Sequence, residues 1–245
     1  MRRWWVSLLV CGLVACSSAE TSERETAVQT TLLVESTTTI PPVCVPGPKA
    51  DLRGCNLHDA NLSGADLSGA DFSAAQLHRA NLSGANLNGA IFTNADLTRA
   101  DLSGANLSAA NLSGANLTSA NLFVAHLPNA QLVRVNLSSA VLATANITGA
   151  DASDAILTDC SCEAANFAGT FFTKSDFTRA NLSGANLNNA TLRYANFAEA
   201  NLEGANLSKT WLLGAIFTGA NLTNANLRGS INNPNQFDDA IGYKS

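Results

Sequence analysis

Apolar residues recur at every fifth position over most of the chain. The series begins at Leu52, Leu57 and Leu62 and runs to Leu227 without an insertion. Two residues before each of these centres stands a small residue, mostly Ala, with Asn or Asp between them, so the unit reads A-[ND]-L-[ST]-G. A period of five fits neither the roughly 3.6 residues of a helical turn nor the two-residue alternation of a strand. Each unit is therefore predicted to form one side of a coil.

The pattern also predicts how the coils close and stack. If the centre and the Ala point inward, four sides close a turn of 20 residues, and successive turns stack at about 4.8 Å through backbone hydrogen bonds. Writing the centres in four columns places like rings together: Phe177, Phe197, Phe217 and Phe237 in one column, and Phe72 with Phe92 in another. The longer column indicates that the coil keeps its phase near Phe237, and Asn232, which replaces a centre, is predicted to be a polar end cap.

This motif resembles that of the pentapeptide-repeat family, and the resemblance covers residues 50 to about 230. It implies an all-β fold, a right-handed four-sided (quadrilateral) parallel β-helix, here a solenoid of about nine 20-residue coils. We expect the β-helix to occupy residues 44–240 and a short C-terminal tail to occupy residues 241–245.

The N-terminus is typical of an exported protein. Arg2 and Arg3 precede a short apolar stretch that ends at Leu13, so residues 1–15 are predicted to be a signal peptide. The segment Leu13-Val14-Ala15-Cys16 resembles the lipobox of bacterial lipoproteins, which implies lipid attachment at Cys16. An ordinary secretory signal cut after Ala15 is the alternative. Residues 16–43, rich in Ser, Thr and Glu, are expected to be a flexible tether. We therefore expect an exported protein, lipid-anchored to the bacterial cell membrane or envelope.

Four further cysteines fall into two pairs. Cys44 and Cys55 flank the Pro46-Gly47-Pro48 turn before the first coil, and we expect a disulfide that pins this edge. Cys160 and Cys162 both point inward, and the sequence leaves open whether they are bridged or remain thiols.

The repeat is least regular around this second pair. Ala152 and Cys162 stand at centres, whereas Cys160, Thr170 and Ser175 replace the inner Ala. Phe167, Phe172 and Phe177 follow at once, which we interpret as compensation of core volume.

Little in the composition supports catalysis. Charged residues make up 13% of the chain, it has 3 His, and its inner positions are almost wholly apolar. No Ser-His-Asp arrangement, phosphate-binding Gly loop or pair of inward carboxylates emerges. His58 and His78 lie on neighbouring coils, but a surface His pair without a third ligand seldom binds metal. We expect no enzyme, no cofactor, no metal and no small-molecule substrate.

One outward column carries a candidate partner surface. Phe171, Trp211 and Ile231 share this column, and Leu213, Arg193 and Tyr194 lie beside it. Aromatic residues with Arg are typical of interface cores, so an unknown protein partner, or a second copy, could bind here. The alternative is that these are ordinary scattered apolar residues.

These observations favour a non-catalytic, membrane-tethered structural or protein-binding module of the cell envelope. The resemblance supplies an alternative, because some family members imitate DNA and inhibit topoisomerases such as gyrase, which confers quinolone resistance. DNA carries about one charge per 1.7 Å, so a ~43 Å mimic needs on the order of 25 negative charges. Residues 50–227 carry only 13 acidic and 8 basic side chains, which disfavours mimicry. The chain also contains no basic run that would bind nucleic acid directly.

Ice binding is a further alternative. It is motivated by one outward column of hydroxyl side chains: Thr98, Thr118, Ser138, Thr158, Thr178 and Thr218. Ser or Thr also follows the centre in many repeats of this chain, and the neighbouring columns are irregular. We therefore rank ice binding below both other hypotheses.

Overall fold

The computed structural model describes residues 44–233 and 236–242. The chain divides into two units, Met1–Ile40 and Pro41–Ser245, and the described residues all belong to the second. The predicted signal peptide (residues 1–15), the predicted lipidation site Cys16 and the predicted tether (residues 16–43) lie outside the described residues.

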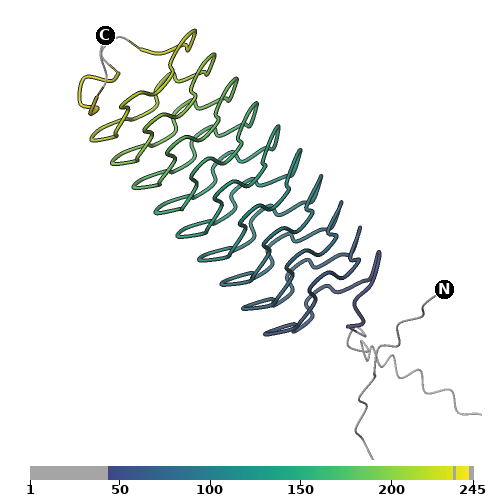
Figure 1. Cartoon of the computed structure of the whole chain (residues 1–245). Helices are drawn as coiled ribbons and strands as arrows, with labels where there is room; N and C mark the ends of the chain where they lie inside the picture. The colour runs from purple at the N-terminus through teal and green to yellow at the C-terminus, as the bar shows by residue number, and fades with distance from the viewer. Residues whose placement is uncertain (1–43, 234–235, 243–245) are drawn as a thin grey trace, which may run out of the picture. The chain divides into compact units, whose positions relative to one another are not determined.

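The described part of the chain consists of stacked coils (Figure 1). It contains no helix and no strand longer than a single bridge residue, and hence no helix long and apolar enough to cross a membrane. Parallel bridges join residues 20 positions apart, from Asp51↔Asp71 through to Asn221↔Ile241. The 20-residue period is confirmed, and the Ile241 bridge extends the coil one residue past the expected boundary at residue 240.

The hydrogen bonds explain why the repeat has this sequence. In Asp71–Ala75, the N–H groups of Asp71, Phe72 and Ala74 donate to carbonyls of neighbouring coils at 2.6–2.9 Å. The Ala75 N–H closes the turn on Phe72 O at 2.9 Å. The remaining donor, the Ser73 N–H, bonds to Asp71 Oδ1 at 2.9 Å. Asn or Asp before the centre therefore accepts the one backbone N–H that the coils leave unpaired.

The glycine of the repeat also has a structural cause. It is the third residue of each turn, where the backbone adopts a positive φ, for example +64° at Gly54. Type II turns require this conformation, which glycine adopts without steric cost. Residues with side chains also occupy the position, among them Tyr194 at +60°.

The core consists of the centres and the inner Ala residues, which are buried along most of the stack. The predicted ring columns are confirmed. Phe197 stacks between Phe177 and Phe217, with centroid distances of 4.9 and 5.1 Å, and Phe72 stacks on Phe92 at 4.7 Å.

The irregular stretch is fully packed. Cys160 and Cys162 are bridged by a buried disulfide, with their Cα atoms 5.7 Å apart. The buried hydroxyls of Thr170 and Ser175 donate to the carbonyls of Ile147 and Ala152 at 2.7 and 2.8 Å. Phe167, Phe172 and Phe177 pack edge to face. The large rings next to small centres support the interpretation of compensated core volume.

Separate contacts close the two ends of the described stack. At the first coil, Cys44 and Cys55 form a disulfide with a Cα–Cα distance of 5.9 Å. At the last coil, Gln236 Nε2 donates to Leu212 O at 2.6 Å, and Asn233 Oδ1 accepts the Gly214 N–H at 3.1 Å.

The prediction that Asn232 is the end cap is wrong. Asn232 is exposed and bonds to Ser230 at 3.5 Å, whereas Asn233 and Gln236 make the capping contacts. The five-residue pattern is interrupted after Ile231, so the centre position at Asn232 does not point inward, whereas the next centre, Phe237, is buried and its ring lies 5.0 Å from that of Phe217.

Candidate protein-binding surface

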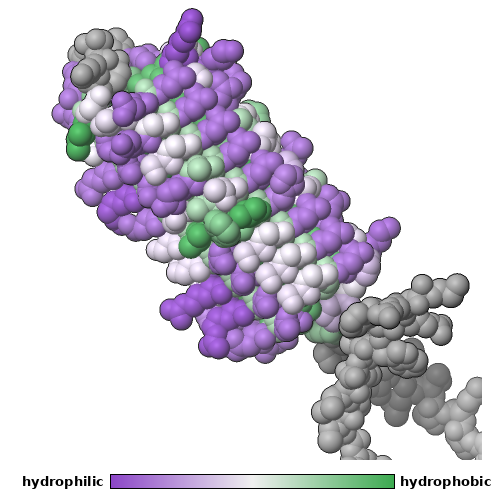
Figure 2. All heavy atoms as spheres, viewed as in Figure 1, coloured by the Kyte–Doolittle hydropathy of each residue, from purple (hydrophilic) through white to green (hydrophobic). Residues whose placement is uncertain are grey.

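The predicted surface residues lie on one side of the last coils. Phe171, Thr191, Trp211 and Ile231 are joined by successive parallel bridges and form what we call the aromatic column. The side chains of Phe171, Trp211 and Ile231 are 50%, 51% and 48% exposed. They occupy the outward position that Asn or Asp takes in most repeats. Figure 2 shows one face of the coils, on which hydrophilic residues dominate and hydrophobic areas are small.

A depression lies within the aromatic column. Thr191 is much smaller than Phe171 and Trp211, which stand one coil to either side of it, so that the two rings are separated by two coil spacings, about 9.6 Å. The depression has a volume of about 610 Å³. Its lining residues are Phe171, Thr173, Lys174, Asn189, Thr191, Arg193, Tyr194 and Trp211.

Arg193 and Tyr194 form one wall of this depression. The Arg193 guanidinium carbon lies 5.6 Å from the centroid of the Tyr194 ring, within the range of a cation–π contact. The Arg193 Nε atom is buried and has no hydrogen-bond partner among the described residues. The Tyr194 ring packs against Gly214, where a Cβ atom would clash with ring atoms Cδ1 and Cε1. Glycine at position 214 therefore makes room for the Tyr194 ring.

The two charged residues that line the depression, Lys174 and Arg193, are both cationic. No carboxylate lines it, and neither Lys174 nor Arg193 has an ion pair within the described ranges. Elsewhere on the coils, Arg179 Nε lies 2.7 Å from Asp159 Oδ1, and this hydrogen-bonded pair lowers the pKa of Asp159 and raises the pKa of Arg179. By contrast, Lys174 and Arg193 have no carboxylate partner among the described residues.

The structure brings most of the predicted surface residues together. Phe171, Arg193, Tyr194 and Trp211 line the depression, whereas Leu213 is half-buried and Ile231 continues the column beyond it. Four lining residues were not predicted from the sequence: Thr173, Lys174, Asn189 and Thr191. The 20-residue period could have identified Thr191, because it shares the column with Phe171 and Trp211.

A second group of exposed apolar residues was not predicted from the sequence. Phe123, Val124 and Val141 are 48%, 52% and 37% exposed. Arg and Lys do not accompany these three residues in their own repeats, so this group lacks the cationic residues of the aromatic column.

The histidines make a structural contact. The His58 and His78 rings stack with centroids 5.0 Å apart, and His58 Nε2 lies 2.8 Å from Asp59 Oδ2. Asp59 also pairs with Arg79 at 2.9 Å. Among the described residues, no group of three or more His, Cys, Asp or Glu side chains could hold a metal ion.

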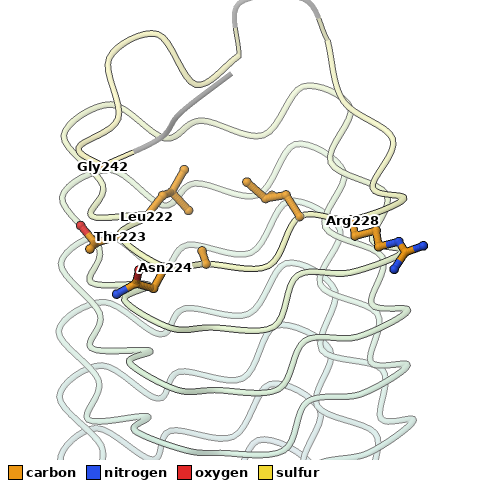
Figure 3. Close-up of a pocket in the computed structure, with 7 residues that line it drawn as sticks. Leu222, Thr223, Asn224, Arg228 and Gly242 are labelled. Atoms are coloured by element: carbon orange, nitrogen blue, oxygen red, sulfur yellow. The ribbon is translucent and has the colours of Figure 1, made fainter.

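A second hollow lies at the last coil (Figure 3). It has a volume of about 560 Å³ and is lined by Leu222, Thr223, Asn224, Ala225, Leu227, Arg228 and Gly242. In Figure 3 the Arg228 side chain points away from the hollow and Leu222 lies within the outline of the coil. The hollow exposes the edge of the core, and it holds no set of polar groups that converge on one point.

Comparison with known proteins agrees with this architecture. A family model described as pentapeptide repeats matches residues 50–89, 75–114, 90–127, 115–154, 155–193 and 195–231. A comparison with curated protein sequences gives no match.

Solved structures give further matches. The chain is 32% identical to HetL, a pentapeptide repeat protein involved in heterocyst differentiation regulation in the cyanobacterium Nostoc sp. strain PCC 7120, over 79% of this chain and 87% of HetL, with a TM-score of 0.45. It is 20% identical to QnrB1, a plasmid-mediated fluoroquinolone resistance protein, over 68% of this chain and 91% of QnrB1, with a TM-score of 0.45. It is 39% identical to a pentapeptide repeat protein of the Arabidopsis thaliana thylakoid lumen, over 44% of this chain and 69% of that protein, with a TM-score of 0.26. The family model spans far more than half of the sequence, and the chain therefore belongs to the pentapeptide-repeat family, whose β-helical solenoid its parallel ladder displays.

Proposed function

We propose that this protein is a non-catalytic binding module of the bacterial cell envelope that holds a protein partner on the aromatic column. The observation that carries this proposal is the depression between Phe171 and Trp211, with Arg193 beside it. The earlier repeats on this side of the coils mostly have Asn or Asp at the position of the two rings. Exposed aromatic and Arg side chains are enriched in the cores of interfaces.

The rest of the coil wall supports a binding role over a catalytic one. Inward side chains are almost all apolar and buried. Many outward Asn and Asp side chains accept backbone N–H groups within their own repeat, as Asn206 does from Ser208 at 3.2 Å. Residues that could transfer protons are thus either few or engaged in the fold.

Membrane tethering is the second element of the proposal. It rests on the resemblance of Leu13–Cys16 to a lipobox and on the Ser/Thr-rich composition of residues 16–43. A flexible coil of that length has a root-mean-square reach of roughly 30 Å. Such a tether would hold the binding surface close to the membrane.

The two alternatives have less support. Gyrase inhibition by DNA mimicry would need a denser negative charge than the wall carries, and Lys174 and Arg193 add positive charge to one side. Ice binding would need free hydroxyls, but the hydroxyls of Thr118 and Ser138 donate to Asn116 and Asn136 at 2.6 and 2.7 Å.

Site-specific photo-crosslinking in cells tests the binding role. A photoreactive phenylalanine analogue is placed at Trp211, and in a second strain at Asn111, which lies in the same column five coils earlier. We expect discrete crosslinked products from position 211 and none from position 111. Equal crosslinking from both positions, or none from either, would contradict a binding surface at the aromatic column.

Metabolic labelling with a palmitate analogue tests the tether. The full chain and its Cys16→Ala variant are expressed in a bacterial host, and the membranes are fractionated. We expect label and membrane retention in the wild type and loss of both in the variant. An unlabelled wild type would refute the lipid anchor while leaving the binding role to the crosslinking result.

A further inference from the structure

We infer that the depression binds an acidic segment of a protein partner, with one apolar side chain of that segment seated over Thr191. This inference rests on the proposed binding function and adds the chemical class of the partner. The apolar and the charged parts of the depression support it separately.

The apolar part has the size of one side chain. Phe171 and Trp211 stand about 9.6 Å apart along the column, with the short Thr191 between them. About half of each aromatic side chain is still exposed, at 50% and 51%. A branched or aromatic side chain inserted between the two rings would contact both and remove this apolar area from water.

The charged part of the depression, formed by Lys174 and Arg193, favours a carboxylate as its ligand. Arg193 Nε is buried without an acceptor, and a buried donor left unpaired is costly. The Tyr194 ring, which packs against Gly214, lies within cation–π distance of the same guanidinium group. Carboxylates accept hydrogen bonds from arginine with good geometry. A carboxylate of the partner would pair with the charged groups of Arg193 and Lys174, which have no ion pair among the described residues.

The charge of the region favours this partner over a second copy or a lipid surface. A two-fold dimer through the column would place the cations of both copies together, and like charges at an interface oppose association. Peripheral binding to anionic lipid strengthens with each added basic residue, and only Lys174 and Arg193 line the depression.

Binding of designed peptides to the purified full chain in detergent tests the inference. The probe is a fluorescein-labelled Gly-Glu-Asp-Phe-Glu-Asp-Gly peptide, followed by fluorescence anisotropy. One control peptide replaces the acidic residues by Lys and Arg, and another replaces Phe by Ala. We expect saturable binding of the acidic Phe peptide and at least about tenfold weaker binding of both controls.

Three variants locate the site. Arg193→Gln removes the cation, and Trp211→Ala removes one wall; each should weaken binding by about tenfold. Thr191→Phe fills the depression while adding apolar surface, so it should also weaken binding by about tenfold, whereas non-specific apolar adhesion would become stronger. Arg134→Gln is the matched control, because Arg134 is exposed on the same side two coils before Lys174 and outside the depression.

Each remaining outcome overturns the inference. Peptide binding that survives Thr191→Phe would place the site elsewhere. Concentration-dependent dimerisation abolished by Trp211→Ala would make a second copy the occupant. Binding of phosphatidylglycerol vesicles that depends on Arg193, without peptide binding, would make the occupant a lipid surface. Absence of peptide binding combined with specific crosslinking from position 211 would overturn the acidic partner and leave the binding function standing.

Discussion

Two neighbouring sides of the same coils use the position before the centre in opposite ways. On one side, Asn166, Asn186, Asn206 and Asn226 form what we call the asparagine ladder. The last three of these amides each donate from Nδ2 to Oδ1 of the Asn on the previous coil, at 3.1–3.2 Å. The same Oδ1 atoms accept backbone N–H groups two residues later in their own repeats. The next side carries the aromatic column.

The difference shows which side chains serve the fold and which are free for recognition. The backbone bonds continue unchanged beneath the aromatic column, as in Phe172 N to Thr191 O at 2.8 Å. The apolar side chains of Phe171, Trp211 and Ile231 cannot accept the N–H groups that Asn accepts. This side therefore lacks the side-chain hydrogen bonds to the backbone that stabilise the asparagine ladder. It exposes apolar area that a partner can cover.

The core beneath both sides offers the largest expected effect. Phe197 is fully buried between two stacked rings, and Phe197→Ala should lower the free energy of unfolding by about 3–5 kcal/mol because it leaves a cavity. Urea denaturation measures the loss, and hydrogen exchange should show both sides loosening together. Loosening confined to the aromatic column would show that the two sides do not share one core.

The asparagine ladder should be more sensitive than the aromatic column to loss of a side chain. Asn186→Ala removes three hydrogen bonds, to Asn166, Asn188 and Asn206, and should cost about 1–3 kcal/mol. Thr191→Ala, on the neighbouring side of the next coil, should change the free energy of unfolding by less than about 0.5 kcal/mol. Equal losses in the two variants would remove the distinction between the sides.

A glycine substitution separates backbone strain from the packing of Tyr194. Gly184→Ala and Gly214→Ala both place a Cβ on a residue with positive φ, +65° and +75°, and should cost about 1–2 kcal/mol each. A Cβ added at Gly214 would clash with the Tyr194 ring, whereas a Cβ added at Gly184 would have no atom within 4 Å. Thermal denaturation should therefore show the larger loss for Gly214→Ala. Equal losses in the two variants would show that the packing of the Tyr194 ring does not require glycine at position 214.

The smallest expected effect is the pH dependence of an ion pair outside both sides. The Arg179 hydrogen bond lowers the pKa of Asp159 in the folded chain below its ordinary value near 3.8. The stabilisation is therefore complete above that value and is lost as the pH falls through the lowered folded pKa. Chemical denaturation at each pH measures this loss. Between pH 5 and pH 2, the free energy of unfolding should fall less in the Asp159→Asn variant than in the wild type. Asp154→Asn is the matched control, and an effect of equal size there would contradict the assignment.

The sequence alone predicts the buried half of this fold well. Because each centre contacts centres 20 residues away, the period by itself places Phe177, Phe197 and Phe217 in one stack. The same arithmetic places Phe171, Trp211 and Ile231 in one outward column. Both results follow from an uninterrupted repeat, in which position in the chain determines position in space.

Other features depend on contacts that the period does not encode. The period predicts only that the Asn and Asp before the centre face water, although they also accept the remaining backbone donor. Asn233 and Gln236 make the capping contacts in place of Asn232 because the five-residue pattern is interrupted locally after Ile231. The depression arises from the small size of Thr191 relative to its two neighbours, which a search for large apolar residues overlooks.

The most direct test of the exchange between stability and recognition is the free energy of unfolding of a triple variant, Phe171→Asn, Thr191→Asn and Trp211→Asn. This variant rebuilds an asparagine ladder on the side that lacks one. We predict that it is more stable than wild type by about 1–3 kcal/mol, from hydrogen bonds worth about 0.5–1.5 kcal/mol each. An unchanged or lower free energy of unfolding would show that the aromatic column is part of what holds the coils together, and would contradict its assignment as a surface kept for a partner.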